Sequence, residues 1–168
     1  DRLYSDVEFA KFYAQLFQNG VIATIGSGLQ VKQAATPGMS VLVSAGACVI
    51  NGRQMINDAD YSVVISAAGS VSDRYDSVVA QLNLPNRVVT IAYKQGSTAV
   101  QRDANIYELQ LATIKVAKNV SVITAADITD KRANTTVCGY STPYEALNLE
   151  SLQDQYETML SAAFTAVQ

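Results

Sequence analysis

Two groups of carboxylates beside an arginine have the residue types best suited to acid–base chemistry in this chain. They are Asp73, Arg74 and Asp76 in one group and Asp127, Asp130 and Arg132 in the other. A general acid that works near neutral pH needs a raised pKa, whereas a neighbouring guanidinium pairs with a carboxylate and lowers its pKa. The sequence therefore places Asp73 and Arg74, and Asp130 and Arg132, in structural ion pairs and predicts no catalytic residue.

Other residues that could bind a ligand lack the pattern that such a site needs. Asp58 and Asp60 lie in NDAD, which lacks the spaced oxygen ligands of a calcium loop, and the glycines of IGSGL have no phosphate-binding sequence after them. The strand-forming runs contain four tyrosines that could form a sugar platform, although core or interface packing is the commoner role. These are Tyr61, Tyr75, Tyr93 and Tyr107. We expect no metal and no cofactor.

Histidine is absent and the two cysteines are far apart in the sequence. The chain has no His and 2 Cys, so the Ser/His and Cys/His nucleophile pairs and imidazole metal ligands are missing. Cys48 and Cys138 stand in apolar or turn sequence with no CxxC partner, and we expect two buried or free thiols rather than a disulfide.

The composition describes a domain with an unusually small number of charges. Only 16% of the 168 residues are charged, against about 25% in typical soluble domains, which suggests that other chains cover part of the surface. The formal net charge is −3 and the basic residues are scattered, so nucleic-acid binding is not expected. No apolar run approaches the roughly 20 residues of a membrane span, and the start lacks a signal-peptide pattern, which predicts a soluble, unexported protein.

The first element that could position functional side chains is a helix from about Asp6 to Gln18. Ser5 and Glu8 form a capping box before it, and Gly20 supplies a stop after it. Its wide apolar stripe predicts packing on its own body or, alternatively, a docking face for another protein. The candidate docking residues are Phe9, Phe12, Tyr13, Leu16 and Phe17.

Short β-prone runs separated by turn residues fill the middle of the chain and predict an antiparallel sandwich or barrel of seven or eight strands. Asn51-Gly52 is the strongest turn, because this pair tolerates the positive φ angles of a two-residue hairpin. Pro85 and Asn86 mark a second tight connection, and a change of apolar phase between Ile106 and Val116 predicts a β-bulge or a strand buried on both faces. The runs are 29–33, 40–50, 61–66, 76–84, 87–94, 107–116 and 120–124.

An amphipathic helix is predicted from near Pro143 to the end of the sequence. Thr142, Pro143 and Glu145 have the types and spacing of a helix start. Apolar residues then recur at alternating spacings of three and four, as in the seam of a short coiled coil, which favours self-association without setting the number of copies; the alternative is that the helix folds back on its own domain. The seam residues are Leu149, Leu152, Tyr156, Met159 and Ala163.

Several stretches, taken in order, resemble the N-terminal region of tail and baseplate proteins of long-tailed bacteriophages, including upper baseplate, receptor-binding and tail-fibre proteins. They are YSDVEFAKFYAQLFQNGV, SVLVSAGACVINGR, RYDSVVAQLNL followed by RVVTIAYKQG, and YELQLATIKVAKN leading to DITDKRANTTVCG. The resemblance covers most of residues 4–139. Its most specific part consists of Asp127, Ile128, Thr129, Asp130, Arg132, Cys138 and Gly139.

The resemblance implies a β-rich attachment module in the virion, made in the bacterial host cytoplasm, that oligomerises, often as a trimer, and contacts other tail or baseplate proteins. We therefore expect an α+β, mainly β protein that is not an enzyme and does not insert into membranes. Its expected parts are an N-terminal helix (1–20), an antiparallel β-domain (21–139) and a C-terminal oligomerisation helix (140–168). A carbohydrate-binding β-sandwich module is the alternative function, and a hydrolase is a third, weaker hypothesis.

Overall fold

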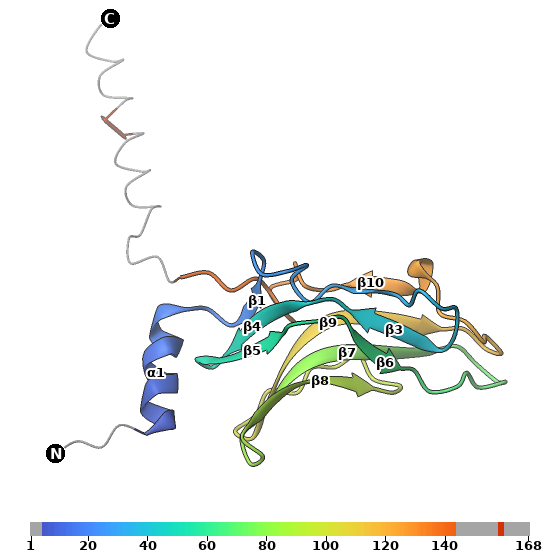
Figure 1. The fold of residues 1–168 in the computed structure, drawn as a ribbon, viewed down its shortest axis with the longest axis horizontal. Helices are drawn as coiled ribbons and strands as arrows, with labels where there is room; N and C mark the ends of the chain where they lie inside the picture. Colours follow the sequence, from blue (N-terminus) through green and yellow to red (C-terminus); the bar gives the residue numbers. More distant parts are fainter. Residues whose placement is uncertain (1–4, 144–157, 160–168) are drawn as a thin grey trace, which may run out of the picture.

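A computed structural model describes residues 5–143, 158 and 159, and their main feature is an elongated β body with one helix at its end (Figure 1). Thr158 and Met159 are helical, whereas the other residues of the predicted C-terminal helix after Pro143 lie outside the described residues. The described elements are α1 (Asp6–Leu16), β1 (Gly20–Ile22), β2 (Val31–Gln33), β3 (Ser40–Val43), β4 (Gly46–Ile50), β5 (Arg53–Asn57), β6 (Tyr61–Val64), β7 (Arg74–Asn83), β8 (Val88–Lys94), β9 (Ile106–Val116), η1 (Ala125–Asp127) and β10 (Ile128–Asp130).

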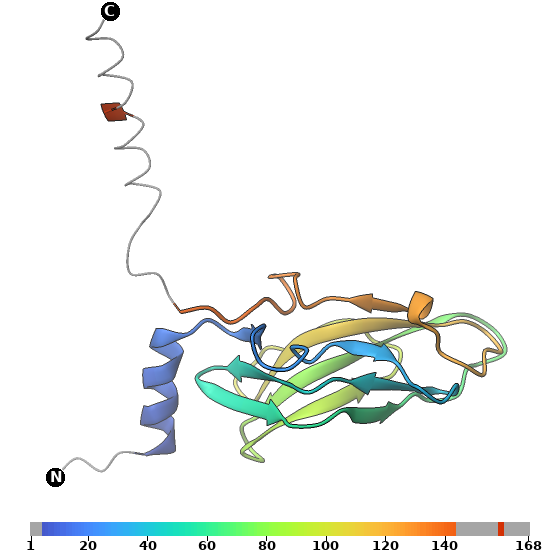
Figure 2. The ribbon, with the colours of Figure 1, turned by 45° about the horizontal axis from the view of Figure 1, so that its top comes forward.

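The described strands form three antiparallel sheets, which confirms the mainly β prediction. Their orders are β1-β4-β5, β2-β3-β6 and β10-β9-β7-β8, and these pairings do not close any sheet into a barrel. Because β3 runs on into β4 and β5 into β6 with only two or three residues between them, the two small sheets follow one another along the body, over the larger sheet (Figure 2). One apolar cluster contains side chains from all three sheets, including Val41, Cys48 and Leu109.

The turn residues and the alternation of side chains set the register as predicted. Asn51 and Gly52 join β4 to β5 in a two-residue hairpin with φ of 49° and 73°. A turn over residues 84–87 joins β7 to β8, where Val78 faces Tyr93 across the ladder and the same face continues into the core. The positive φ of both hairpin residues explains why Asn-Gly occupies this position.

The phase change in β9 is a β-bulge. Val78 pairs with Ala112, but the next residue of β7, Val79, pairs with Gln110, so that Leu111 is the extra residue of β9. Leu109, Leu111 and Ala112 are all buried, because the bulge lets the apolar residues on both sides of it point into the same core. The bulge alternative of the sequence prediction is therefore confirmed.

Several local predictions are wrong, including the count of seven or eight strands, because the described residues form ten. The run 120–124 is not a strand: Ile123 is buried and its N–H bonds to the Gly38 carbonyl, but the segment joins no ladder. α1 ends at Leu16 rather than near Gln18, and Gly20 belongs to β1, because Phe17 is extended and bridges Pro143. The same bridge means that Pro143 is not the first residue of a helix.

Candidate docking site

Helix α1 is held at the end of the body by the β4–β5 hairpin. Ser5 and Glu8 form the predicted capping box at its start, with the Glu8 N–H donating to Ser5 Oγ at 3.3 Å and the Ser5 N–H to Glu8 Oε2 at 2.9 Å. Ala10 is its only buried residue. A Cβ added at Gly52 would collide with the Ala10 carbonyl, so the absence of a side chain in the hairpin turn permits the close contact.

A pair of asparagines fixes the link between α1 and the hairpin. Asn51 N–H donates to Asn19 Oδ1 at 2.7 Å, and Asn19 Nδ2 donates to Asn51 Oδ1 at 2.9 Å. Beyond the hairpin, Arg53 approaches Asp6 at 4.0 Å. These contacts orient α1, but they cover only the narrow side of the helix that carries small side chains.

The aromatic side of α1 is exposed, and we call it the aromatic stripe. Its spacing of three and four residues follows one face of the helix, with the last member just after it. Phe12 and Tyr13 meet edge to face with ring centroids 5.6 Å apart. The exposed fractions are 54% for Phe9, 56% for Phe12, 47% for Tyr13, 42% for Leu16 and 36% for Phe17. The first of the two predictions for this helix is packing on its own body. Within the described residues, the body covers little of the stripe.

An apolar cavity of about 700 Å³ continues the stripe toward the body. Tyr13 and Phe17 line it on the side of the helix, Ile22 and Val49 line it on the side of the sheet, and Pro143 also lines it. The main chain is tied here as well, because the Gln18 N–H donates to the Thr142 carbonyl at 2.9 Å. The stripe and the cavity together form one apolar surface at the end of the body.

The predicted ion pairs lie in the β body, not in this surface. Arg74 pairs with Asp76 rather than with Asp73, through Nε and Oδ1 at 2.8 Å, while Asp73 pairs with Lys115 at 3.3 Å. Asp76 is fully buried and also accepts hydrogen bonds from the Gly96 N–H and from Tyr93 Oη, each at 2.7 Å. Burial by itself raises the pKa of Asp76, but the hydrogen bonds from Arg74, Gly96 and Tyr93 outweigh it and hold the pKa below its ordinary value. Such a carboxylate is a structural group.

Arg132 joins the last strand to the loop after β1. Its Nη2 lies 2.6 Å from Asp130 Oδ2, and its Nη1 donates to the Ser27 and Gly28 carbonyls at 2.8 Å each. The hydrogen bonds from Arg132 lower the pKa of Asp130. Asp127 has a different role, since it accepts hydrogen bonds from Thr124 at the start of η1.

Replacing Arg132 with alanine should lower the free energy of unfolding by about 2 kcal/mol. The Arg132 side chain is only 11% exposed and the change leaves two carbonyls without their donor, but Asp130 is 45% exposed and remains solvated, so the loss is smaller than for a fully buried pair. Urea denaturation measures it, with Lys131→Ala as the neighbouring control. Equal stability of the two variants would mean that the contacts of Arg132 do not stabilise the fold.

The remaining candidates do not converge on a chemical site. Asp60 pairs with Lys32 and accepts from the Ala45 N–H, and no group of three metal-binding side chains occurs in the described ranges. Cys48 and Cys138 are buried free thiols, as predicted, and burial raises the pKa of each to about 12.

The four tyrosines lie in different environments. Tyr93 bonds to Asp76 in the buried network, and Arg102 lies over the Tyr107 ring at 4.9 Å. Tyr61 and Tyr75 are about half exposed, so these two do not pack in the core of the described body, and neither lines the apolar cavity. These two tyrosines therefore do not form a sugar-binding platform together with the apolar cavity.

Sequence reasoning missed a buried polar layer on the outer face of the large sheet. Glu108 is 1% exposed; it pairs with Lys94 at 2.6 Å and accepts from Gln81 Nε2 at 2.8 Å. Nearby, Gln110 Nε2 donates to the Thr98 carbonyl at 2.7 Å, which ties the β8–β9 loop across the sheet. The polar residues that alternate with apolar ones in β7 and β9 carried this signal, but the same alternation is typical of solvent-facing positions.

The seam of the predicted C-terminal helix is mostly outside the described residues. Leu149, Leu152, Tyr156 and Ala163 all fall there, and only Met159 is described, with 73% of its surface exposed. No helix among the described residues is long and apolar enough to cross a membrane.

Comparison with known proteins adds no relative to this description. A scan against protein-family models and searches of curated proteins and of solved structures found no match. By architecture, the described residues form a mainly antiparallel β body that carries a helix with an exposed aromatic stripe.

Proposed function

We propose that the chain is a virion structural protein of a long-tailed bacteriophage, an attachment module of the tail baseplate or fibre. In this role it self-assembles and docks on other tail proteins during host adsorption. The support comes from the sequence resemblance over residues 4–139 and from the character of the exposed surface, which suits binding to other proteins.

The aromatic stripe is the observation that carries the proposal. Phe9, Phe12, Tyr13 and Leu16 follow the i, i+3, i+4, i+7 spacing by which an amphipathic helix is bound in an apolar groove. Exposed apolar patches of this kind are uncommon on proteins that act alone, and aromatic residues supply much of the binding energy in interfaces. The helix is held in place by the hairpin, so the stripe is presented with little loss of conformational entropy on binding.

Self-assembly is the second part of the proposal and rests on the C-terminal sequence. A seam of Leu149, Leu152, Tyr156, Met159 and Ala163 would be covered in a parallel bundle, and the resemblance favours three copies. The bundle is short, so contacts between bodies must add to it. In the body, two small sheets face one large sheet across a single core. This arrangement supports the sandwich form of the predicted fold.

A carbohydrate-binding module is the alternative, favoured by the exposure of Tyr61 and Tyr75. A module that acts alone as a lectin should bind a sugar without partner proteins. We expect no glycan to bind the isolated chain above background on a glycan array. Reproducible binding that is lost in Tyr61→Ala or Tyr75→Ala would favour the alternative.

Immunogold electron microscopy tests the virion assignment directly. Antibodies raised against the purified chain are applied to the phage particles whose genome encodes it. The proposal predicts gold at the tip of the tail. Virions that carry no label there, while the same antibodies detect the chain in the lysate, would contradict the proposal.

A further inference from the structure

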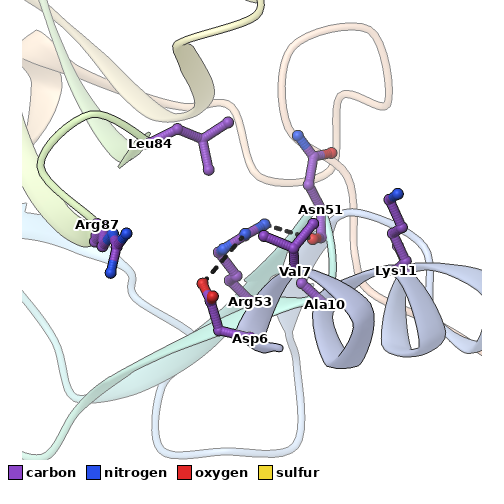
Figure 3. A pocket seen from close by; sticks show the side chains of 9 residues that line it. Asp6, Val7, Ala10, Lys11, Asn51, Arg53, Leu84 and Arg87 are labelled. Atoms are coloured by element: carbon purple, nitrogen blue, oxygen red, sulfur yellow. Dashed lines mark hydrogen bonds and ion pairs between the residues drawn. The ribbon is translucent and has the colours of Figure 1, made fainter. Parts of the chain in front are cut away.

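A cationic groove lies between α1 and the β7–β8 turn (Figure 3). Asn51 and Arg53 of the hairpin line it, whereas Gly52 and Gln54 line the apolar cavity. The groove has a volume of about 640 Å³ and is lined by Lys11 of α1, Arg53 of β5 and Arg87 of the turn, with Asp6 as its one carboxylate. Three cations and one carboxylate leave the groove with two positive charges in excess, although the whole chain has a net charge of −3.

The cations of the groove are poorly neutralised by the part of the chain that the structure describes. Arg53 is 4.0 Å from Asp6 and donates to the Asn51 carbonyl at 3.4 Å, both at the long limit of such contacts. Lys11 and Arg87 are exposed and their side chains form no ion pair with another described residue. Cations that line one groove with too few counter-charges favour binding of an anionic group.

The sequence after Arg132 supplies the complementary charge. It contains no lysine or arginine, and residues 144–168 contain four acids. Three of them, Glu150, Asp154 and Glu157, are spaced by four and then three residues, so on the predicted helix they form one acidic stripe about 10 Å long. In the heptad that places Leu149 at a and Leu152 at d, these acids occupy positions b and f, away from the seam.

We propose that the cationic groove binds the acidic stripe of a second copy of this chain. Carboxylates of Glu150, Asp154 and Glu157 from one copy would pair with Lys11, Arg53 and Arg87 of its neighbour. This inference rests on the proposed self-assembly and deepens it: the seam joins the helices, and the acidic stripe joins each helix to a neighbouring body.

The position of Pro143 favours a second copy over the same chain. Thr142 and Pro143 line the apolar cavity together with Gly52, whereas Asn51 and Arg53 line the cationic groove, so the chain leaves the body on the opposite side of the hairpin from the groove. In a parallel bundle, positions b and f face away from the seam, so the acidic stripe remains accessible to the body of a neighbouring copy.

Carbodiimide cross-linking of the full chain locates the contact, because it joins a lysine amine to a carboxylate in direct contact. Unlabelled and ¹⁵N-labelled chains are unfolded, mixed, refolded together and cross-linked, and the linked peptides are identified by mass spectrometry. We expect links from Lys11 to Glu150, Asp154 or Glu157, with mixed-label pairs in the random proportion. Pairs of one label only would assign the groove to the same chain and overturn the inference.

Charge reversal provides a second, functional test. Lys11→Glu with Arg87→Glu should weaken self-association about tenfold, as should Glu150→Lys with Glu157→Lys, and an equal mixture of the two variants should restore it. Lys118→Glu with Lys131→Glu makes the same change in net charge away from the groove and should have no such effect. An oligomer of unchanged affinity in both reversals, without the cross-links, would overturn the inference and leave self-assembly intact. A monomeric wild-type chain would contradict both.

Discussion

Replacing Asp76 with alanine should lower the free energy of unfolding by about 3–5 kcal/mol, the largest loss that we expect from a single polar substitution in the body. The change leaves Arg74, whose side chain is 18% exposed, without its carboxylate, and leaves Tyr93 Oη and the Gly96 N–H without an acceptor. The network joins β7, β8 and the chain after β6, because Arg74 also donates to the Ser66 carbonyl. Urea denaturation measures the loss.

Asp73→Ala is the matched control, since its exposed carboxylate accepts the Lys118 N–H and pairs with Lys115 at the surface, and its removal should cost much less than that of Asp76. Because the pKa of Asp76 is lowered, its contribution to stability is present above its unfolded pKa of about 4 and is lost as the pH falls through the lower folded value. The wild-type chain should therefore lose this contribution in acid, whereas Asp76→Ala has none to lose. Similar losses for Asp73→Ala and Asp76→Ala would contradict the structural role of the buried network.

Replacing Gly52 with alanine should detach α1 from the body. Gly52 has φ of 73°, where a side chain costs about 1–2 kcal/mol, and the new Cβ would collide with the Ala10 carbonyl, so that the helix must shift. We expect amide hydrogen exchange to accelerate throughout α1 while the β7–β9 ladder keeps its protection. The aromatic stripe would then lose its fixed orientation, and binding that depends on it should weaken with it.

Gly69→Ala serves as the control, because a Cβ there meets no atom within 4 Å and the residue has no positive φ. It should leave both exchange and stability close to the wild type. Unchanged protection of α1 in Gly52→Ala would mean that the hairpin does not hold the helix.

Sequence reasoning predicted the local features whose cause is local. The capping box at Ser5, the Asn51-Gly52 hairpin and the bulge near Leu111 each depend on backbone preferences or on an apolar pattern within a few residues. The exposure of the aromatic stripe could not be predicted, because the stripe has the same pattern whether a helix packs on its own body or on another protein.

Features decided by distant partners were harder to predict. Arg74 pairs with Asp76 two positions along the same strand face rather than with adjacent Asp73, since neighbouring residues in a strand point to opposite faces. The run around Ile123 has strand-like residues, but the Ile123 N–H bonds to the Gly38 carbonyl in a loop, and this distant contact is not visible in the local pattern. Phe17 leaves the helix early because a residue 126 positions away, Pro143, bridges it, and no pattern near Phe17 reports that contact.

Light scattering on the purified 168-residue chain tests the central claim, that this protein is a self-assembling module, most directly. The account predicts a mass that is a multiple of 18.0 kDa, with three copies favoured by the resemblance. Leu152→Asp combined with Met159→Asp should shift the mass toward one copy, because both residues lie in the predicted seam and Met159 is 73% exposed on the single chain. A wild-type chain that remains monomeric at high micromolar concentration would contradict the claim.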